Sequence, residues 1–235
     1  MTSDGGRRSV GAGFTIVELL VAVAILVMVS TITFGIFATV TKAWQRGTAL
    51  SQDLHHGDFI IEQLIGGLRQ ARYRNQNDGL LLTDNGEGPE AHDSISWVKE
   101  GSDLVGEDSP LSKTFHRVKF FIGPDEETGK IGAVYTAWGD TYLQPDEFDP
   151  EDLPPEILSD RVVGFNVRVA TNNFENDTLN WLDAWDEAIG AGDNQSNHVP
   201  RFVELTVYLK PLDENEPPFE MKRCVDIPIA NAGMK

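Results

Sequence analysis

Residues 13–20, Gly13-Phe14-Thr15-Ile16-Val17-Glu18-Leu19-Leu20, decide the fold, because they open an apolar run that continues to Val40. Between Phe14 and Val40, roughly 27 residues, Glu18 is the single ionisable side chain. A helix of that length measures about 40 Å, which exceeds the ~30 Å hydrocarbon core of a membrane. The run therefore predicts a membrane-spanning helix.

Glu18 is the unusual residue of this run. A carboxylate inside a membrane segment costs about 2.5–3.5 kcal/mol on insertion scales, so it indicates a function and requires a partner. An ordinary secretory signal has an apolar core of about 7–15 residues, which is shorter than this run. A plain membrane anchor fits the length but leaves the carboxylate unexplained.

The start of the chain resembles the class III signal of type IV pilins and type II secretion pseudopilins: a short basic leader, a glycine, then Phe-Thr-Ile-Val-Glu and a long apolar helix. The resemblance implies that a prepilin peptidase cuts after Gly13 and that Phe14 becomes the N-methylated N-terminus. An amine and a carboxylate are each unfavourable in an apolar phase, and pairing relieves both. Glu18 is therefore expected to meet the amine of its own Phe14, or that of a neighbouring subunit in a filament.

The chain divides into four predicted segments: a cleaved leader (1–13), a transmembrane helix (14–40), an amphipathic continuation of that helix (41–77) and an acidic head (78–235). In the continuation, apolar residues recur at helical spacing, which predicts one face for a packing partner. They are Leu50, Leu54, Ile61, Leu64, Ile65 and Leu68. The pair Gly66-Gly67 marks either a bend or a close approach by a neighbouring helix.

In the head, the apolar period changes to two, which predicts strands. We expect them at Ile95–Trp97, Phe115–Ile122, Ile131–Trp138, Arg161–Ala170 and Pro200–Lys210, with a final strand that places Val225, Ile227 and Ile229 on one face. Such alternation is typical of antiparallel sheet with one buried side. The predicted fold class is α+β and pilin-like, with a long N-terminal helix packed on an antiparallel sheet.

The acidic charge is concentrated in the head. The whole chain has a net charge of −18, and residues 78–235 carry 32 acidic and 12 basic side chains, a net charge of −20. This argues against nucleic-acid binding, because phosphates would be repelled. The acid clusters Asp84–Glu90, Asp125–Glu127, Asp146–Asp152 and Asp183–Glu187 leave calcium as an alternative, but none follows a regular calcium-loop spacing, so no cofactor is expected.

No catalytic constellation is visible, so an enzyme is not expected. The five histidines lack zinc-site spacing, and there is no glycine-rich phosphate loop. The single cysteine, Cys224, excludes an intramolecular disulfide and is expected to be a buried small hydrophobe. Trp181 and Trp185, at a spacing that suits one helical face, either cover a sheet edge or core or form an exposed docking patch; the sequence leaves both open.

Roughly residues 161–230 resemble the J-type minor pseudopilin of type II secretion, through a Val-x-Phe-x-Val strand, a Trp-containing segment, a Val-Glu-Leu-Thr-Val strand and a closing Ile-Pro. This implies a structural subunit at the tip of a pseudopilus. Its implied partners are other minor and major pseudopilins through the N-terminal helix, prepilin peptidase, the inner-membrane assembly platform and exported protein substrates.

Orientation follows from Arg7 and Arg8, which favour a cytoplasmic N-terminus and a periplasmic head on a single inner-membrane span. Two rivals stay open. One is a minor type IV pilin that primes pilus assembly for adhesion, motility or DNA uptake. The other is an anchored enzyme or binding protein that uses the same export signal.

Overall fold

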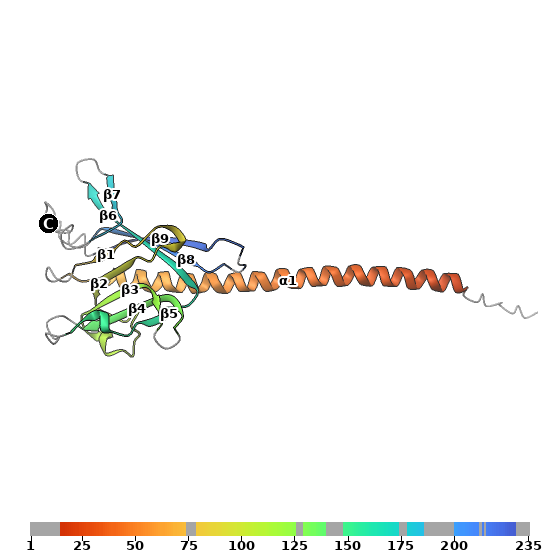
Figure 1. The fold of residues 1–235 in the computed structure, drawn as a ribbon, viewed down its shortest axis with the longest axis horizontal. Coiled ribbons are helices and arrows are strands. Elements are labelled where there is room, and N and C mark those ends of the chain that lie inside the picture. Colours follow the sequence, from red (N-terminus) through yellow and green to blue (C-terminus); the bar gives the residue numbers. More distant parts are fainter. Residues whose placement is uncertain are drawn as a thin grey trace, which may run out of the picture. The chain divides into compact units, whose positions relative to one another are not determined.

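The structure, a computed structural model, describes residues 15–73, 79–125, 129–139, 148–173, 178–185, 200–211, 213 and 215–228. It separates into two compact units, Met1–Ala49 and Leu50–Lys235, and we call the second the head unit. The elements are α1 (Ile16–Arg69), β1 (Leu81–Thr83), η2 (Gly88–Glu90), β2 (Ser94–Lys99), η3 (Pro110–Lys113), β3 (His116–Pro124), β4 (Ile131–Gly139), η5 (Pro150–Asp152), β5 (Glu156–Ser159), β6 (Val162–Asn173), β7 (Thr178–Leu182), β8 (Phe202–Leu209) and β9 (Phe219–Asp226) (Figure 1).

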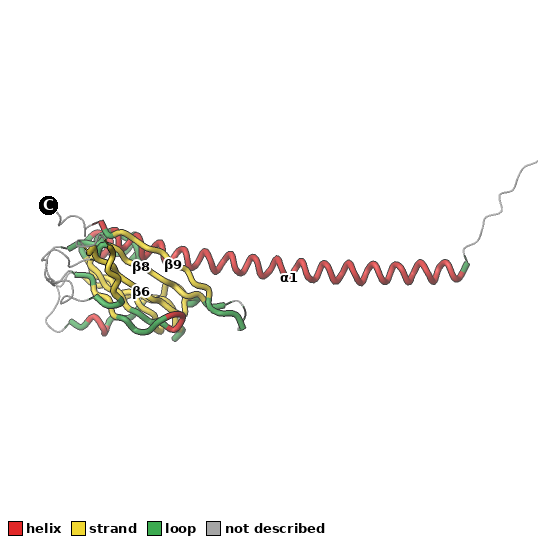
Figure 2. The backbone as a smooth tube through the Cα atoms, turned by 90° about the horizontal axis from the view of Figure 1, so that it is seen from above, coloured by secondary structure: helices red, strands yellow, loops and turns green. Residues whose placement is uncertain are grey.

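The strands form two antiparallel sheets in the head unit. The first has the order β1-β2-β3-β4-β5, and the second has the order β7-β6-β8-β9. Every pairing between neighbours is antiparallel, and Figure 2 shows β6, β8 and β9 side by side. The predicted α+β class, one long apolar N-terminal helix with antiparallel sheet, is confirmed.

The part of α1 inside the head unit buries one face in the core. The buried positions are Gly57, Ile60, Ile61, Leu64, Ile65, Gly67 and Leu68. They recur at spacings of three and four residues, the period of one helix face. Phe59, on the other face, stays 52% exposed. Of the predicted apolar face, Ile61, Leu64, Ile65 and Leu68 are buried, whereas Leu50 is 41% exposed. The buried face shares one core with strand residues of both sheets.

Two contacts tie the sheets to each other inside that core. Phe120 of β3 and Phe165 of β6 meet edge to face, with ring centroids 4.7 Å apart. The buried carboxylate of Asp93 accepts hydrogen bonds from the backbone N–H groups of Asn85 (2.8 Å) and Val167 (2.7 Å). Burial raises the pKa of Asp93, while both of these donors favour its charged form.

Two isolated β-bridges add to the connection between the two sheets. Leu82 of β1 pairs with Trp185, and His92 pairs with Phe165. Trp185 is 2% exposed and belongs to the core. Because Leu82 and Trp185 exchange backbone hydrogen bonds of 2.7 and 3.0 Å, the outer edge of the short strand β1 is partly closed.

On the helix, Asp53 is fixed by the corner between β5 and β6. Arg161 donates from Nε (3.0 Å) and Nη2 (2.7 Å) to the two carboxylate oxygens of Asp53, and from Nη2 to the Lys210 carbonyl (3.1 Å). A two-pronged pair of this kind sets direction as well as distance. It holds this turn of α1 against the corner.

The end of α1 is enclosed by the end of β2 and the loop after it. Trp97 donates from Nε1 to the carbonyl of Gly67 (2.9 Å), and Leu104 donates its backbone N–H to Gln63 Oε1 (2.9 Å). The buried ammonium of Lys99 donates to the carbonyls of Gly101 and Asp103, both at 2.8 Å. These contacts join the helix end, the strand and the loop, and we call them the helix-end clamp.

The helix ends earlier than the segment 41–77 predicted. It stops at Arg69, and Ala71 then pairs with Lys99 while the Arg72 N–H donates to the Val98 carbonyl (2.9 Å). The physical reason is that these backbone groups hydrogen-bond to β2, and a longer helix would lose those hydrogen bonds. The last residues of the predicted segment, 74–77, lie outside the described residues.

Among the predicted strands, β2, β3, β4, β6, β8 and β9 are present near the expected bounds. Val225 and Ile227 are buried as expected, although β9 ends at Asp226, and Ile229 lies outside the described residues. Strands β1, β5 and β7 were missed. They are short, and pairing with longer neighbours rather than apolar alternation stabilises them.

One side-chain prediction was wrong. Cys224 is exposed, because Met221 and Val225 of β9 face the core and Cys224 has the opposite parity on this edge strand. Trp181 and Trp185 do not share a helix: Trp181 lies on β7, and Trp185 follows it in a bridge. His55 and His56 are exposed on the stem.

We expect Gly67→Ala to destabilise the head unit and Gly66→Ala to leave it nearly unchanged. A Cβ on Gly67 would lie 2.9 Å from Cζ2 of the buried Trp97, whereas a Cβ on Gly66 would meet only the carboxylate end of Asp103, at 2.8 Å, which can rotate away. Overpacking costs about 1–3 kcal/mol, against a gain of about 1 kcal/mol in helix propensity. Urea unfolding of a fragment that begins at Leu50 measures both, and equal stabilities would contradict the close approach.

We also expect the clamp lysine to give a distinctive pH dependence. Burial lowers the pKa of Lys99 to about 8, partly offset by Asp103. Between about pH 8 and 10.4 the unfolded chain holds a proton that the folded chain has released, so stability rises with pH there, by about 2–3 kcal/mol. The difference in unfolding free energy between wild type and Lys99→Met should follow that rise and be flat below pH 8. Parallel curves throughout would contradict the burial of a charged amine.

Candidate functional site at the start of the helix

Thr15 is the residue that starts α1. It directly precedes the first helical residue, Ile16, and its carbonyl accepts the hydrogen bond of the Leu19 N–H (3.2 Å). Its hydroxyl accepts from the backbone N–H of Glu18 (3.2 Å). Thr15 is therefore the N-cap, and it satisfies one of the N–H groups that a helix start leaves open.

The Glu18 side chain in turn accepts hydrogen bonds from Thr15. Its Oε2 accepts from the backbone N–H of Thr15 (3.0 Å) and from the Thr15 hydroxyl (2.9 Å). Together with the bond to Thr15 Oγ1, this is a reciprocal capping box between the N-cap residue and the third helical residue. The carboxylate predicted to be the functional group is thus held at the helix start in a defined direction.

The second carboxylate oxygen is not used by this arrangement. Both bonds end on Oε2, and the structure shows none to Oε1 from the residues it describes. A carboxylate has about four acceptor positions, so it can receive a further donor without giving up the capping box. The positive pole of the helix adds a favourable interaction with the negative charge here.

Sequence reasoning found Glu18 but missed Thr15. The signal was present as Thr15-Ile16-Val17-Glu18, because Thr-x-x-Glu before an apolar run is the sequence pattern of a capping box. Gly13 and Phe14, the predicted cleavage position and new N-terminus, lie outside the described residues. The structure therefore brings together Glu18 and Thr15, and the proposed role of the amine stays a prediction.

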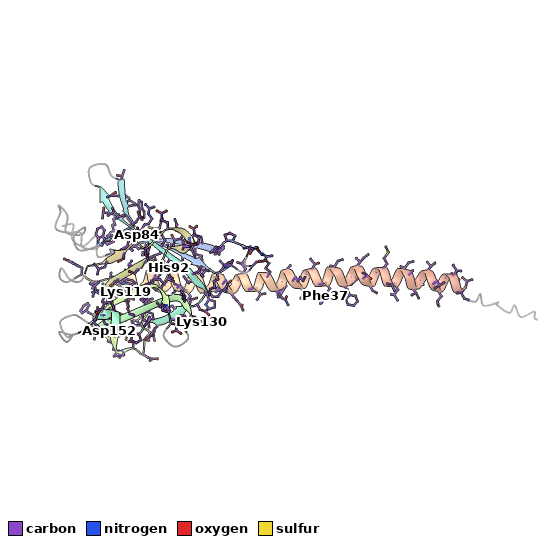
Figure 3. The ribbon with its side chains drawn as sticks, in the orientation of Figure 1. Phe37, Asp84, His92, Lys119, Lys130 and Asp152 are labelled. Atoms are coloured by element: carbon purple, nitrogen blue, oxygen red, sulfur yellow. The ribbon has the colours of Figure 1, made fainter. Side chains whose placement is uncertain are left out.

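Behind this start, α1 presents apolar side chains that the described residues of the chain leave exposed. It is long and apolar enough to cross a membrane. Large apolar residues from Ile16 to Val40 are about half exposed or more, and Figure 3 shows Phe37, 69% exposed, projecting from the helix. The hydroxyls of Thr31, Thr33 and Thr39 donate to carbonyls one turn earlier, at 2.8–2.9 Å. These three hydroxyls are thus satisfied within the helix, as an apolar surrounding requires.

The head unit contains a polar hollow but no metal cluster among the residues described. The hollow, about 290 Å³, is lined by Asp84, Glu87, Gly88, Asn166, Arg168 and Asp183. Arg168 neutralises part of its charge, since Nε donates to Asp183 Oδ1 at 2.8 Å. In the described part of the chain, no three His, Cys, Asp or Glu side chains are grouped to hold a metal ion.

Arg168, which lines this hollow, also contacts Trp181: its guanidinium carbon is 5.7 Å from the centre of the Trp181 ring. Trp181 is half-buried, while Trp185 is in the core. The reading of these residues as aromatics that cover a sheet edge and core therefore applies to Trp185. Trp181 contributes a surface contact on the edge strand β7.

We expect Thr15→Val to loosen the first turn of α1, whereas Thr15→Ser should keep it. Valine removes the hydroxyl that both caps the helix and donates to Glu18, and loss of an N-cap costs about 1 kcal/mol. Amide hydrogen exchange of residues 16–19 in detergent-solubilised full-length protein measures this. The account predicts several-fold faster exchange for valine only; equal protection in both variants would show that the capping box does not hold the helix start.

No protein-family model and no curated sequence matches this chain. Among solved structures, it is similar to a type IV-like pilin from Thermus thermophilus, with a TM-score of 0.40 and 11% sequence identity over 74% of this chain and 97% of that chain. A similarity of this size carries no information about function, which has to come from the residues of the chain itself.

Proposed function

We propose that this chain is a membrane-anchored structural subunit of a pilin-type filament, and specifically a minor pseudopilin of type II protein secretion. The observation that carries the proposal is the carboxylate of Glu18 at the head of a long apolar helix, held through one oxygen by Thr15. A charge in that place is costly unless it is paired, so its retention calls for a cationic partner in the same apolar phase.

The partner in this proposal is the amine released by removal of the leader. Cleavage after Gly13 would leave Phe14 as the N-terminus, directly before the N-cap Thr15, and N-methylation would keep the amine positively charged. Oε1 of Glu18 is the acceptor that the capping box leaves available. The amine of Phe14 in the same subunit, or in the next one, then neutralises the carboxylate, and the second arrangement sets the axial register between subunits.

Assembly follows from the surface of α1. Its apolar side chains contact lipid in the anchored subunit and can contact other helices in a filament, where van der Waals packing replaces lipid contact. The partners in this proposal are other minor and major pseudopilins. Prepilin peptidase processes the chain, the inner-membrane platform assembles it, and the periplasmic head meets exported proteins.

The choice of type II secretion rests on the sequence resemblance of residues 161–230 to J-type pseudopilins, not on the fold. A minor type IV pilin would use the same helix start. A neighbouring secretin gene without a retraction ATPase favours secretion, and the reverse favours a pilus. In either case we propose a structural subunit without catalysis or cofactor, and calcium binding by the head loops stays the alternative.

The test separates the charge of Glu18 from its capping role. Glu18→Gln keeps an oxygen that accepts from Thr15, since Gln also completes a capping box, but it removes the charge. Glu18→Val removes both. We expect both variants to insert and to be cleaved, and both to lose most assembly, measured as shear-released filaments or secreted substrate relative to wild type.

Each outcome has a distinct meaning. Normal assembly of Glu18→Gln would contradict the ion pair with the amine. A defect confined to Glu18→Val would assign the residue to helix capping alone.

A further inference from the structure

Strand β9 forms a long open edge of the second sheet. The edge strand β1 has three residues and is bridged to Trp185, β5 has four residues and β7 has five, whereas β9 has eight. Of the residues in β9, Met221 and Val225 are buried and the rest are exposed, and the strand contains neither proline nor glycine. No strand among the described residues pairs with its outer side. An edge of this length and exposure can accept another strand.

The hydrogen bonds show which backbone groups of β9 point outward. The Ile227 N–H donates to the Arg201 carbonyl (2.8 Å), and β9 pairs with β8 without a register shift. Backbone groups alternate in direction along an antiparallel strand, so the odd-numbered residues bond to β8 and the even-numbered ones point away. The even-numbered residues include Glu220, Lys222 and Cys224. The Lys222 carbonyl agrees with this direction, because it accepts from Nη1 of Arg223 at 3.0 Å.

The surroundings of this edge carry more acidic than basic charge. Lys222 pairs with Glu204 of β8, and Arg223 pairs with Asp58 of α1, both at 3.4 Å. Strand β9 contains two further acidic side chains, at its second and last positions, so four acids and two bases give this edge a net charge of −2. A basic segment is attracted to such a surface, whereas a second copy of the same edge brings no excess of positive charge.

We propose that the open edge of β9 binds an extended, basic segment of a different protein, which adds a fifth strand to this four-stranded sheet. The main chain of that segment bonds to the outward N–H and C=O groups of β9. On one face its basic side chains meet Glu220, and on the other its apolar side chains extend the surface of Phe219, which is 43% exposed. The partner is therefore a segment in which basic and apolar residues alternate. This proposal does not depend on the proposed function, because it uses neither Glu18 nor the apolar part of α1.

The first test compares peptides on the full-length protein in a nonionic detergent. The probe is a short fluorescent peptide in which valine alternates with lysine and threonine, and its anisotropy reports binding. A second peptide has proline in place of each threonine, which keeps the charge but removes N–H groups that would face β9. We expect wild type to bind the first peptide at least about tenfold more tightly, and a third peptide with glutamate for lysine to bind as weakly as the second.

The second test changes the edge itself. Lys222→Pro removes one outward N–H that β8 does not use, whereas Lys222→Gln removes the same charge and keeps the N–H. We expect roughly tenfold weaker binding of the lysine peptide by Lys222→Pro, and no weakening by Lys222→Gln. Leu179→Pro places a proline at an outward position of the other edge strand, β7, and is the matched control that should bind as wild type. Thermal unfolding checks that each variant is folded, and the peptide comparison on wild type stands without them.

Three results would overturn the proposal. One is equal binding of the threonine and proline peptides by wild type. Another is an equal effect of proline at Lys222 and at Leu179. The third comes from Cys224, the single cysteine of the chain, which lies on this edge. A covalent dimer of the chain that forms through Cys224 on oxidation, and that the lysine peptide does not suppress, would assign the edge to a second copy instead.

Discussion

The need to neutralise one carboxylate at the start of an apolar helix is the constraint on which this protein depends. Glu18 is the single ionisable residue between Phe14 and Val40. In a membrane, the free-energy cost of an unpaired carboxylate is a substantial fraction of the unfolding free energy of a small domain. The capping box with Thr15 supplies two donors to one oxygen. These bonds hold Oε2 in a defined direction, and in the proposed function Oε1 accepts from the incoming amine.

The head unit solves a different problem, which is to join the last turns of α1 to two sheets around one core. Glycine lets the sheet approach: a Cβ at Gly57 would clash with Met221, and one at Gly67 with Trp97. The buried charges of Asp93 and Lys99 are held by backbone groups rather than by each other. The Asp53–Arg161 pair and the helix-end clamp fix the part of α1 inside the head unit at two places.

Much of the fold could be predicted from local periodicity. Apolar residues at Ile61, Leu64 and Leu68 repeat as a helix face does, and the alternation in Val203–Leu209 repeats as a strand does. Contacts between distant residues could not be predicted. Nothing near Asp93 shows that its carboxylate accepts from Val167, and nothing near Gly67 shows that Trp97 will donate to its carbonyl. Cys224 was misjudged because burial on an edge strand depends on which face the neighbouring sheet and helix occupy. Thr15 was missed although its pattern is local and readable.

The central claim is that Glu18 exists to meet an amine created at Phe14. Intact-mass and N-terminal peptide mass spectrometry of the protein purified from its native host tests it most directly. The account predicts a chain that begins at Phe14 and carries one additional methyl group on its amine. A chain that retains residues of the leader, with its amine far from Glu18, would contradict it.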